Sequence, residues 1–308
     1  MLFRSGESGL PVVITMHDYF AFCPVGGYFD FQVGQPCDKK PMGAACIGSN
    51  CDRASYAHKL VRVARQWRSD RALAACCDLT FVHVSDFARR FAEPYLPKHA
   101  RHVTVENMME AQKRPPVDVT QNRHALFLGR LTEEKGVVLL AEAARLAGMP
   151  VRFVGEGPMT DAIRQANPAA ELSGWVAPDE VYAEITSARV VVAPSLWFET
   201  GPMTVMEAMA MGVPAIVSDR MGAADWVADG VTGRHVGQGR VERLAAALGE
   251  ASGAAAAQWG AAGYSNYWKE PFSAARHCSR LLLAYGRLDR LEAAASGAQK
   301  NRSITAPV

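Results

Sequence analysis

Residues 190–219 read VVVAPSLWFETGPMTVMEAMAMGVPAIVSD, and this stretch decides the fold class. VVVAPS (190–195) is a short apolar run typical of a buried strand, and PAIVSD (214–219) is a second one. Between them, residues 201–212 have the length and composition of a helix. A strand, a helix and a strand in this order predict two parallel strands joined by a crossover helix.

The same alternation extends back toward residue 125. The expected strands are 125–131, 150–157 and 171–176, and the expected helices are 136–148, 158–166 and 178–188. Repeated strand–helix units predict an α/β domain, in which a parallel sheet has helices on both faces. Because such crossovers are right-handed, every strand-to-helix loop lies at one edge of the sheet, where ligands bind.

The first part of the chain is less regular. Strands are expected at 11–18, 79–85 and 102–107, helices at 55–75 (capped by Ser55) and 86–95, and a Gly/Cys/Pro-rich excursion at 20–52. A polar segment with two consecutive prolines (110–124) is the best candidate for a linker. Residues 240–290 are predicted to be helical. The expected domains are 1–117, 118–260, C-terminal helices at 261–290 that pack back toward the first domain, and a disordered tail at 291–308.

Composition excludes some classes of protein. The 308 residues carry a formal net charge of +2, so nothing predicts a nucleic-acid partner. No segment approaches the roughly 20 apolar residues that span a membrane. The number of cysteines is seven, which is odd, and no signal-peptide pattern precedes them. We therefore expect a cytoplasmic protein without a disulfide framework.

The loop after residue 195 carries the strongest functional signal. Glu199 precedes the helix 201–212 and Glu207 lies within it, and a carboxylate can accept hydrogen bonds from two hydroxyl groups of a sugar. The free backbone N–H groups of the first helical turn, at Gly201, Met203 and Thr204, suit a diphosphate. Pro202 lies in the same turn and has no N–H group. Alone, two glutamates at this spacing also fit an ordinary solvated helix.

Other loops at the same edge favour the functional interpretation. Gly129 and Arg130 lie at the end of the expected strand 125–131, and Lys135 comes five residues after Arg130, so two cations would neutralise a diphosphate there. Gly157 lies in a turn where backbone can approach a ligand, and the backbone of Trp175 and Val176 could meet a base.

Taken together, FLGRLTEEKG, VGEGP, LSGWV, APSLWFETGPMTVMEAMAMGVPAIVSD and VADGVTG resemble the C-terminal domain of family 4 glycosyltransferases. The resemblance is close over residues 125–236 and looser over 10–110. It implies a GT-B fold, with two Rossmann-like parallel-sheet domains and the active cleft between them. It also implies a retaining transfer from a UDP- or GDP-sugar to a glycan or lipid-linked acceptor, in surface polysaccharide or glycolipid synthesis.

The same resemblance implies roles for individual residues. Arg130 and Lys135 match diphosphate-binding cations, Glu199 the contact to the donor sugar, and Glu207 the contact to the ribose hydroxyls. The backbone at 201–204 matches the part that meets sugar and phosphate. In ITMHDYFAFCP, His17 matches a catalytic histidine near the reacting sugar. The family needs no metal for transfer.

The chain departs from the family at its start, where about ten residues precede Pro11. The first domain is therefore expected to be incomplete and to leave a sheet edge exposed. The isolated chain is expected to associate and to have low activity. A catalytically impaired nucleotide-sugar-binding fragment and a GT-B nucleotide-sugar epimerase stay open as alternatives.

Two further features leave alternatives open. Cys23, Cys37, Cys46 and Cys51 are candidates for a structural zinc site, or are scattered reduced cysteines in a long loop. A basic helix is either solvated or contacts anionic lipid at the inner face of the membrane, and its cations are Lys59, Arg62, Arg65, Arg68 and Arg71.

Overall fold

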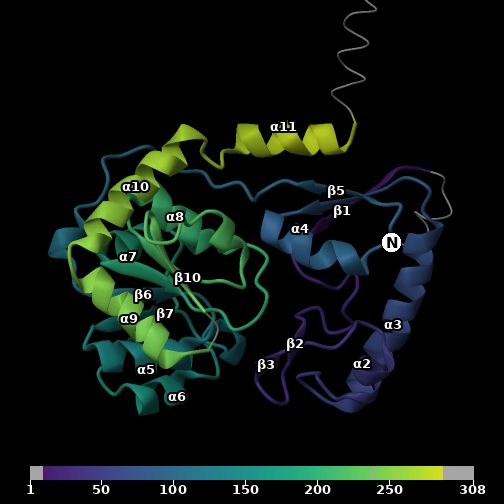
Figure 1. Cartoon of the computed structure of the whole chain (residues 1–308), viewed down its shortest axis with the longest axis horizontal. Coiled ribbons are helices and arrows are strands. Elements are labelled where there is room, and N and C mark those ends of the chain that lie inside the picture. The colour runs from purple at the N-terminus through teal and green to yellow at the C-terminus, as the bar shows by residue number, and fades with distance from the viewer. Residues whose placement is uncertain (1–9, 238, 287–308) are drawn as a thin grey trace, which may run out of the picture.

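The computed structural model describes residues 10–237 and 239–286, and it has two lobes (Figure 1). Each lobe is built on a parallel sheet, and the chain passes between them through residues 105–118, which form no helix or strand. The α/β class with parallel sheets, predicted from the alternation of strands and helices, is confirmed.

The sheet of the first lobe has the strand order β1-β4-β5, with β1 Val12–Met16, β4 Leu79–His83 and β5 Arg101–Thr104. Ile14 is opposite Phe81, which is opposite His102. Helix α3 (Tyr56–Ala75) begins at the predicted cap, because the Ser55 side chain accepts a hydrogen bond from the His58 N–H. The predicted helix 86–95 divides into α4 (Asp86–Ala92) and a 3-10 turn, η1 (Glu93–Tyr95).

The excursion between β1 and α3 has little regular structure. It contains two antiparallel strands of two residues each, β2 (Phe29–Asp30) and β3 (Gln35–Pro36). It also contains one short helix of five residues, α2 (Ala44–Gly48). Its interior is nevertheless packed, since the side chains of Tyr19, Phe22 and Tyr28 are buried against Phe81 of the sheet.

The sheet of the second lobe has the strand order β11-β10-β9-β6-β7-β8, and every pair is parallel. The strands are β6 (Ala125–Leu128), β7 (Val151–Val154), β8 (Glu171–Gly174), β9 (Val190–Ala193), β10 (Ala215–Ser218) and β11 (Gly233–Val236). Every residue of β9 and β10 is buried, as expected for strands covered on both faces. The sequence analysis did not predict β11, because GRHV is polar at its centre.

Helices cover both faces of this sheet. They are α5 (Val137–Ala147), α6 (Thr160–Ala166), α7 (Val181–Ser187), α8 (Met203–Met211) and α9 (Val241–Ser252), with 3-10 turns η2 (Val119–Gln121), η3 (Glu133–Lys135) and η4 (Gly222–Asp225). The helices α5, α6, α7 and α8 are shorter than predicted by up to three residues at an end, where glycine and proline turns end the periodic pattern.

The last two helices return along the molecule. Helix α10 (Ala255–Lys269) packs on α8, and α11 (Ala274–Ala284) lies over the first sheet (Figure 1). Arg276 and Arg280 of α11 both form ion pairs with Glu106, which follows β5. The predicted disordered tail lies outside the described residues. No described helix is both long enough and apolar enough to cross a membrane.

Candidate functional site

The centre of the candidate site is Glu199, in the loop between β9 and α8. Lys135, at the end of η3, donates a hydrogen bond to one of its carboxylate oxygens, and Ser195 Oγ donates to the other. Both partners of the ion pair are largely buried, with side-chain exposures of 17% for Lys135 and 11% for Glu199. The two strand-end loops that the sequence placed at one edge therefore meet through these side chains.

A glycine allows the two loops to approach. Gly136 has φ +71°, a left-handed conformation that glycine adopts readily, and a Cβ added there would lie 2.3 Å from the Pro194 carbonyl oxygen. The backbone after Lys135 is thus held directly against the loop after β9. This close approach fixes the Lys135 side chain beside Glu199.

The first lobe contacts the same loop. Thr200 Oγ1 donates a hydrogen bond of 3.0 Å to the His17 carbonyl oxygen, and Ser85 Oγ donates one of 2.6 Å to the Thr200 carbonyl oxygen. His17 is exposed at the end of β1. Tyr19 is buried, and burial raises the pKa of its phenol, with the Glu199 charge raising it further. The backbone of His17 and the loop that carries Glu199 therefore meet where the two lobes are in contact.

Aromatic packing holds the lobes together around this loop. The Phe198 ring stacks on Phe91 at a centroid distance of 4.2 Å and meets Tyr28 edge-on at 5.7 Å. The Arg220 guanidinium group also lies over the Phe198 ring, with its carbon 5.2 Å from the ring centroid. The residue before Glu199 is thus embedded in side chains of the first lobe.

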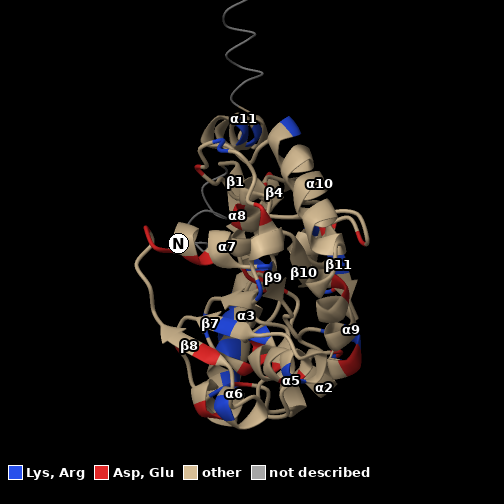
Figure 2. Cartoon of the chain, turned by 90° about the vertical axis from the view of Figure 1, so that its left-hand side faces the viewer, with Lys and Arg blue, Asp and Glu red and all other residues tan. Residues whose placement is uncertain are grey.

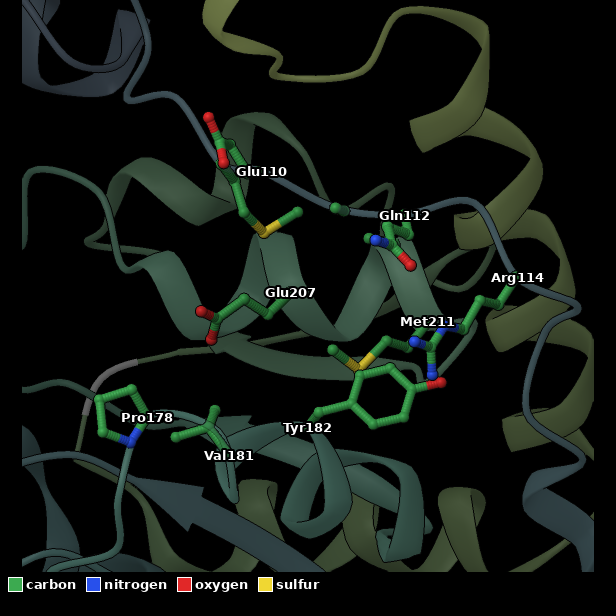
Figure 3. Close-up of a pocket in the computed structure, with 11 residues that line it drawn as sticks. Glu110, Gln112, Arg114, Pro178, Val181, Tyr182, Glu207 and Met211 are labelled. Carbon is green, nitrogen blue, oxygen red and sulfur yellow. The ribbon is translucent and has the colours of Figure 1, made fainter.

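Glu207 lies in a cavity of about 330 Å³ next to the linker (Figure 3). Its carboxylate has no hydrogen-bond or ion-pair partner among the described residues, and burial raises its pKa above the ordinary value. A half-buried, unpaired carboxylate in a cavity suits a ligand that brings hydroxyl donors. The cavity is lined by Met109, Glu110, Ala111, Gln112, Arg114, Pro178, Val181, Tyr182, Glu207, Ala210 and Met211.

The sequence analysis did not find the linker wall of this cavity. Arg114 lies over the Tyr182 ring, with its guanidinium carbon 4.9 Å from the ring centroid, and Gln112 faces the same space (Figure 3). The polar composition of the linker does not predict that it lines a cavity, because the same composition is typical of a connection exposed to solvent.

The other predicted donor-binding residues lie in the neighbouring loops. Gly129 has φ +148°, a backbone conformation that residues with a side chain rarely adopt. Gly157 is in a crowded position, since a Cβ there would lie 2.2 Å from the Leu131 carbonyl oxygen. Arg130 is exposed and makes no ion pair with any described residue. The Trp175 side chain is 69% exposed and outside the Glu207 cavity, whereas Val176 packs partly on the core.

The start of α8 presents backbone donors next to Glu199. Met203 and Thr204 begin the helix, Pro202 is its cap residue, and no side chain caps it. Gly201 packs closely, because a Cβ there would lie 3.3 Å from Trp226. Uncapped N–H groups of a first helical turn are suited to binding an anion.

The four candidate zinc ligands do come together in the excursion. Cys23, Cys37, Cys46 and Cys51 line one small cavity with the Lys59 side chain. All four thiols are free. Within residues 10–237 and 239–286, no three His, Cys, Asp or Glu side chains form a ready-made set of metal ligands.

Surface charge is mixed. The side of the molecule that carries α5, α6 and α9 has both signs interspersed (Figure 2). Of the basic residues of α3, Lys59 is buried, Arg62 is paired with Asp52, and Arg65 lies over the Phe20 ring. Three of the five cations named from the sequence are therefore engaged within the first lobe.

Comparisons with known proteins give matches in both sequence and structure. Residues 122–252 match the family model described as "Glycosyl transferases group 1". The chain is 26% identical over 188 residues to the lipopolysaccharide 1,2-N-acetylglucosaminetransferase of Salmonella typhimurium, covering 52% of this chain and 49% of that protein. It is 32% identical over 181 residues to the phosphatidyl-myo-inositol mannosyltransferase of Mycolicibacterium smegmatis, covering 54% and 46%.

Among solved structures, the Anabaena protein Alr3699/HepE in complex with UDP-glucose superposes with a TM-score of 0.64 at 15% identity. The match covers 94% of this chain and 75% of that one. At this identity the likeness shows the fold alone. The fold is the two-lobed GT-B architecture. The glycosyl transferases group 1 family model matches residues 122–252, which contain most of the second lobe. The chain spans just under half the length of the two curated relatives.

Proposed function

We propose that the protein is a retaining glycosyltransferase that moves a sugar from a UDP- or GDP-sugar to a glycan or lipid-linked acceptor. Surface polysaccharide or glycolipid synthesis is the setting that the relatives' names suggest. The observation that carries the proposal is the pair of carboxylates flanking the first turns of α8, one engaged by Lys135 and the other unpaired in a cavity.

Each group has a part in donor binding. Glu207 accepts hydrogen bonds from the two ribose hydroxyls, which gives its unpaired carboxylate partners. The diphosphate lies against the N–H groups at 203–204, with Arg130 and Lys135 as counter-charges. Glu199 contacts the hydroxyls of the donor sugar, and the backbone at Gly129, Gly157 and Gly201 allows close approach. The base lies on the side of Trp175 and Val176.

The transfer step requires charge stabilisation at the departing diphosphate. The bond between the anomeric carbon and the diphosphate oxygen breaks, and an acceptor hydroxyl oxygen forms the new bond on the same face. The acceptor proton passes to the departing phosphate. Arg130, Lys135 and the start of α8 stabilise the charge that develops, and His17 faces the reacting sugar from the first lobe. The transfer itself needs no metal ion in this proposal.

A donor panel tests this function. UDP- and GDP-sugars are first ranked by their effect on the unfolding temperature, because a ligand that binds the native state stabilises it. The best donor is then incubated with acceptor glycans and glycolipids, and the anomeric configuration of the product is determined. If a donor stabilises the protein and no transfer occurs, the result favours a catalytically impaired nucleotide-sugar-binding fragment. A nucleotide-sugar product with an inverted sugar carbon would indicate an epimerase.

The proposal includes a contact between helix α3 and the membrane. Its buried positions include Gln66 and Leu73, while Val61 and Trp67 are exposed by 71% and 56%. Arg71 lies over the Trp67 ring at 4.7 Å. An exposed tryptophan and aliphatic side chain next to arginine suit the boundary between lipid headgroups and acyl chains. We propose a cytoplasmic protein that uses this face of α3 at the inner membrane surface.

The division of the chain follows from the same proposal. Residues 1–117 would form the acceptor side and 118–260 the donor domain, with 261–290 returning to the first lobe. The contacts of Arg276 and Arg280 with Glu106 support the last part of this division.

A further inference from the structure

The excursion between β1 and α3 encloses a cavity in which four cysteines converge. Cys23, Cys46 and Cys51 are buried, with exposures of 4–6%, and Cys37 is partly buried. The remaining described cysteines (Cys76, Cys77 and Cys278) do not line this cavity. Four cysteines that are separated in sequence by 5 to 14 positions thus share one enclosed space.

Lys59 brings a positive charge into that space without a carboxylate to balance it. Its side chain is fully buried, and its ammonium group donates hydrogen bonds to the carbonyl oxygens of Cys46 and Ser49. No described carboxylate forms an ion pair with it. The two nearby carboxylates are already paired, Asp30 with Lys39 and Asp52 with Arg62. A buried ammonium without an anion is costly, so the cavity calls for negative charge.

The cysteine sulfurs are the groups placed to supply this charge. All four cysteines and Lys59 line the same cavity, so the ammonium group and the sulfurs share one enclosed space. A neighbouring ammonium group stabilises a thiolate relative to the thiol.

The excursion also lacks ordinary means of holding its shape. Its regular structure consists of two two-residue strands and a five-residue helix, and two non-glycine residues, Tyr28 and Met42, have positive φ. Small segments with so little secondary structure are commonly held by disulfides or a metal, and the four thiols are free.

We propose that Cys23, Cys37, Cys46 and Cys51 bind one structural zinc ion, with Lys59 as the buried counter-charge of the site. Zinc prefers four thiolates in tetrahedral geometry, and a Zn²⁺ ion with four thiolates carries a net charge of −2 that Lys59 partly balances. The cysteines are not yet spaced as a ready-made metal set, so binding requires their side chains to rotate inward onto the ion.

The site would position the first lobe against the donor loop. Tyr28 lines the same cavity and contacts Phe198, the residue before Glu199. Arg53, two residues after Cys51, forms an ion pair with the buried carboxylate of Glu134, next to Lys135. Zinc is therefore a structural element of the lobe interface and takes no part in the transfer step.

The test is metal content, which does not depend on the proposed activity. The full chain, purified without chelator and with reducing agent, is analysed for bound metals. We expect stoichiometric zinc in the wild type and in the control Cys77→Ser/Cys278→Ser, which removes exposed cysteines outside the cavity. Cys37→Ser and Cys51→Ser should lose it. Wild type free of zinc, both as purified and after reconstitution with zinc, would overturn the proposal.

A second measurement covers the case in which the cysteine variants fail to fold. Wild-type protein with its zinc exchanged for cobalt should show sulfur-to-cobalt charge-transfer absorption, because thiolates bind the ion. Lys59→Met should release zinc to a competing chelator faster than wild type does. A cobalt spectrum without thiolate bands, or zinc retention in the Cys37→Ser/Cys51→Ser double variant, would contradict the four-cysteine assignment.

Discussion

Lys135 and Glu199 form an ion pair between two strand-end loops that lie 64 positions apart in the sequence. Their side chains are largely buried, and Ser195 completes the hydrogen bonding of the carboxylate. The pair joins the proposed diphosphate cation to the proposed sugar contact before any donor is bound. Donor binding must therefore redistribute the hydrogen bonds of Lys135, since one ammonium group serves both partners.

Lys135→Ala should reduce both stability and transfer. It leaves Glu199 with Ser195 as its remaining side-chain partner, and we expect a loss of about 1–3 kcal/mol in the free energy of unfolding. Glu199→Gln combined with Lys135→Ala should restore part of that stability without restoring transfer. Denaturant unfolding of the two single variants and the double variant measures the coupling energy, and additive losses would contradict the pairing.

Glu207→Gln should weaken donor binding while leaving the fold intact. The carboxylate has no partner to lose among the described residues, so removing its charge relieves a desolvation cost. Above its raised folded-state pKa this group destabilises the native protein, and the cost disappears as pH falls through that pKa. The variant should therefore be equally or more stable at neutral pH. Calorimetry of donor binding checks it, with Glu242→Gln on the surface of α9 as control; equal affinity would refute the ribose assignment.

Arg53→Ala should lower the free energy of unfolding by more than the exposure of the Arg53 side chain suggests. Arg53 is half exposed, but its partner Glu134 is 2% exposed and would be left as an unpaired buried charge. The expected cost is about 3 kcal/mol for breaking one side of such a pair. Arg53→Ala/Glu134→Gln should recover most of it, and thermal unfolding of the three variants gives the comparison.

The buried pair His83 and His102 should make stability depend on pH. His83 Nε2 lies 3.0 Å from His102 Nδ1, and burial lowers the pKa of His83 from 6.5 to about 4. The neutral form is favoured in the native state, so its contribution is complete above pH 6.5 and is lost as pH falls toward 4. The full shift corresponds to at most about 3 kcal/mol. Unfolding measured across this range should show a steeper decline in wild type than in His83→Phe.

The exposed face of α3 should bind anionic vesicles. Trp67→Ala and Arg68→Glu/Arg71→Glu are each expected to reduce co-sedimentation with vesicles that contain anionic lipid. Arg164→Glu, on α6 of the second lobe, is the control, since it makes one Arg-to-Glu change at a position outside α3. Binding of the wild type that is independent of anionic lipid content would exclude the electrostatic part of this contact.

Much of the second lobe could be predicted from its sequence. The apolar runs of β6, β7, β9 and β10 are typical of strands buried on both faces, and the glycine and proline turns mark their ends. The strand β11 was missed because Arg234 and His235 interrupt its apolar pattern, and it is an edge strand that pairs with β10. The hydrophobic pattern of the sequence does not by itself predict a strand that is stabilised by pairing with its neighbour.

The sequence by itself determined the α/β class and the edge at which Glu199, Lys135 and the start of α8 would lie. These follow from local periodicity and from the handedness of crossovers, which do not depend on distant contacts. Only the tertiary structure decided that Lys135 reaches Glu199, that linker residues wall the Glu207 cavity, and that four cysteines surround Lys59. The reason is that these contacts join segments tens of residues apart, and their distances are set by how the lobes and loops pack.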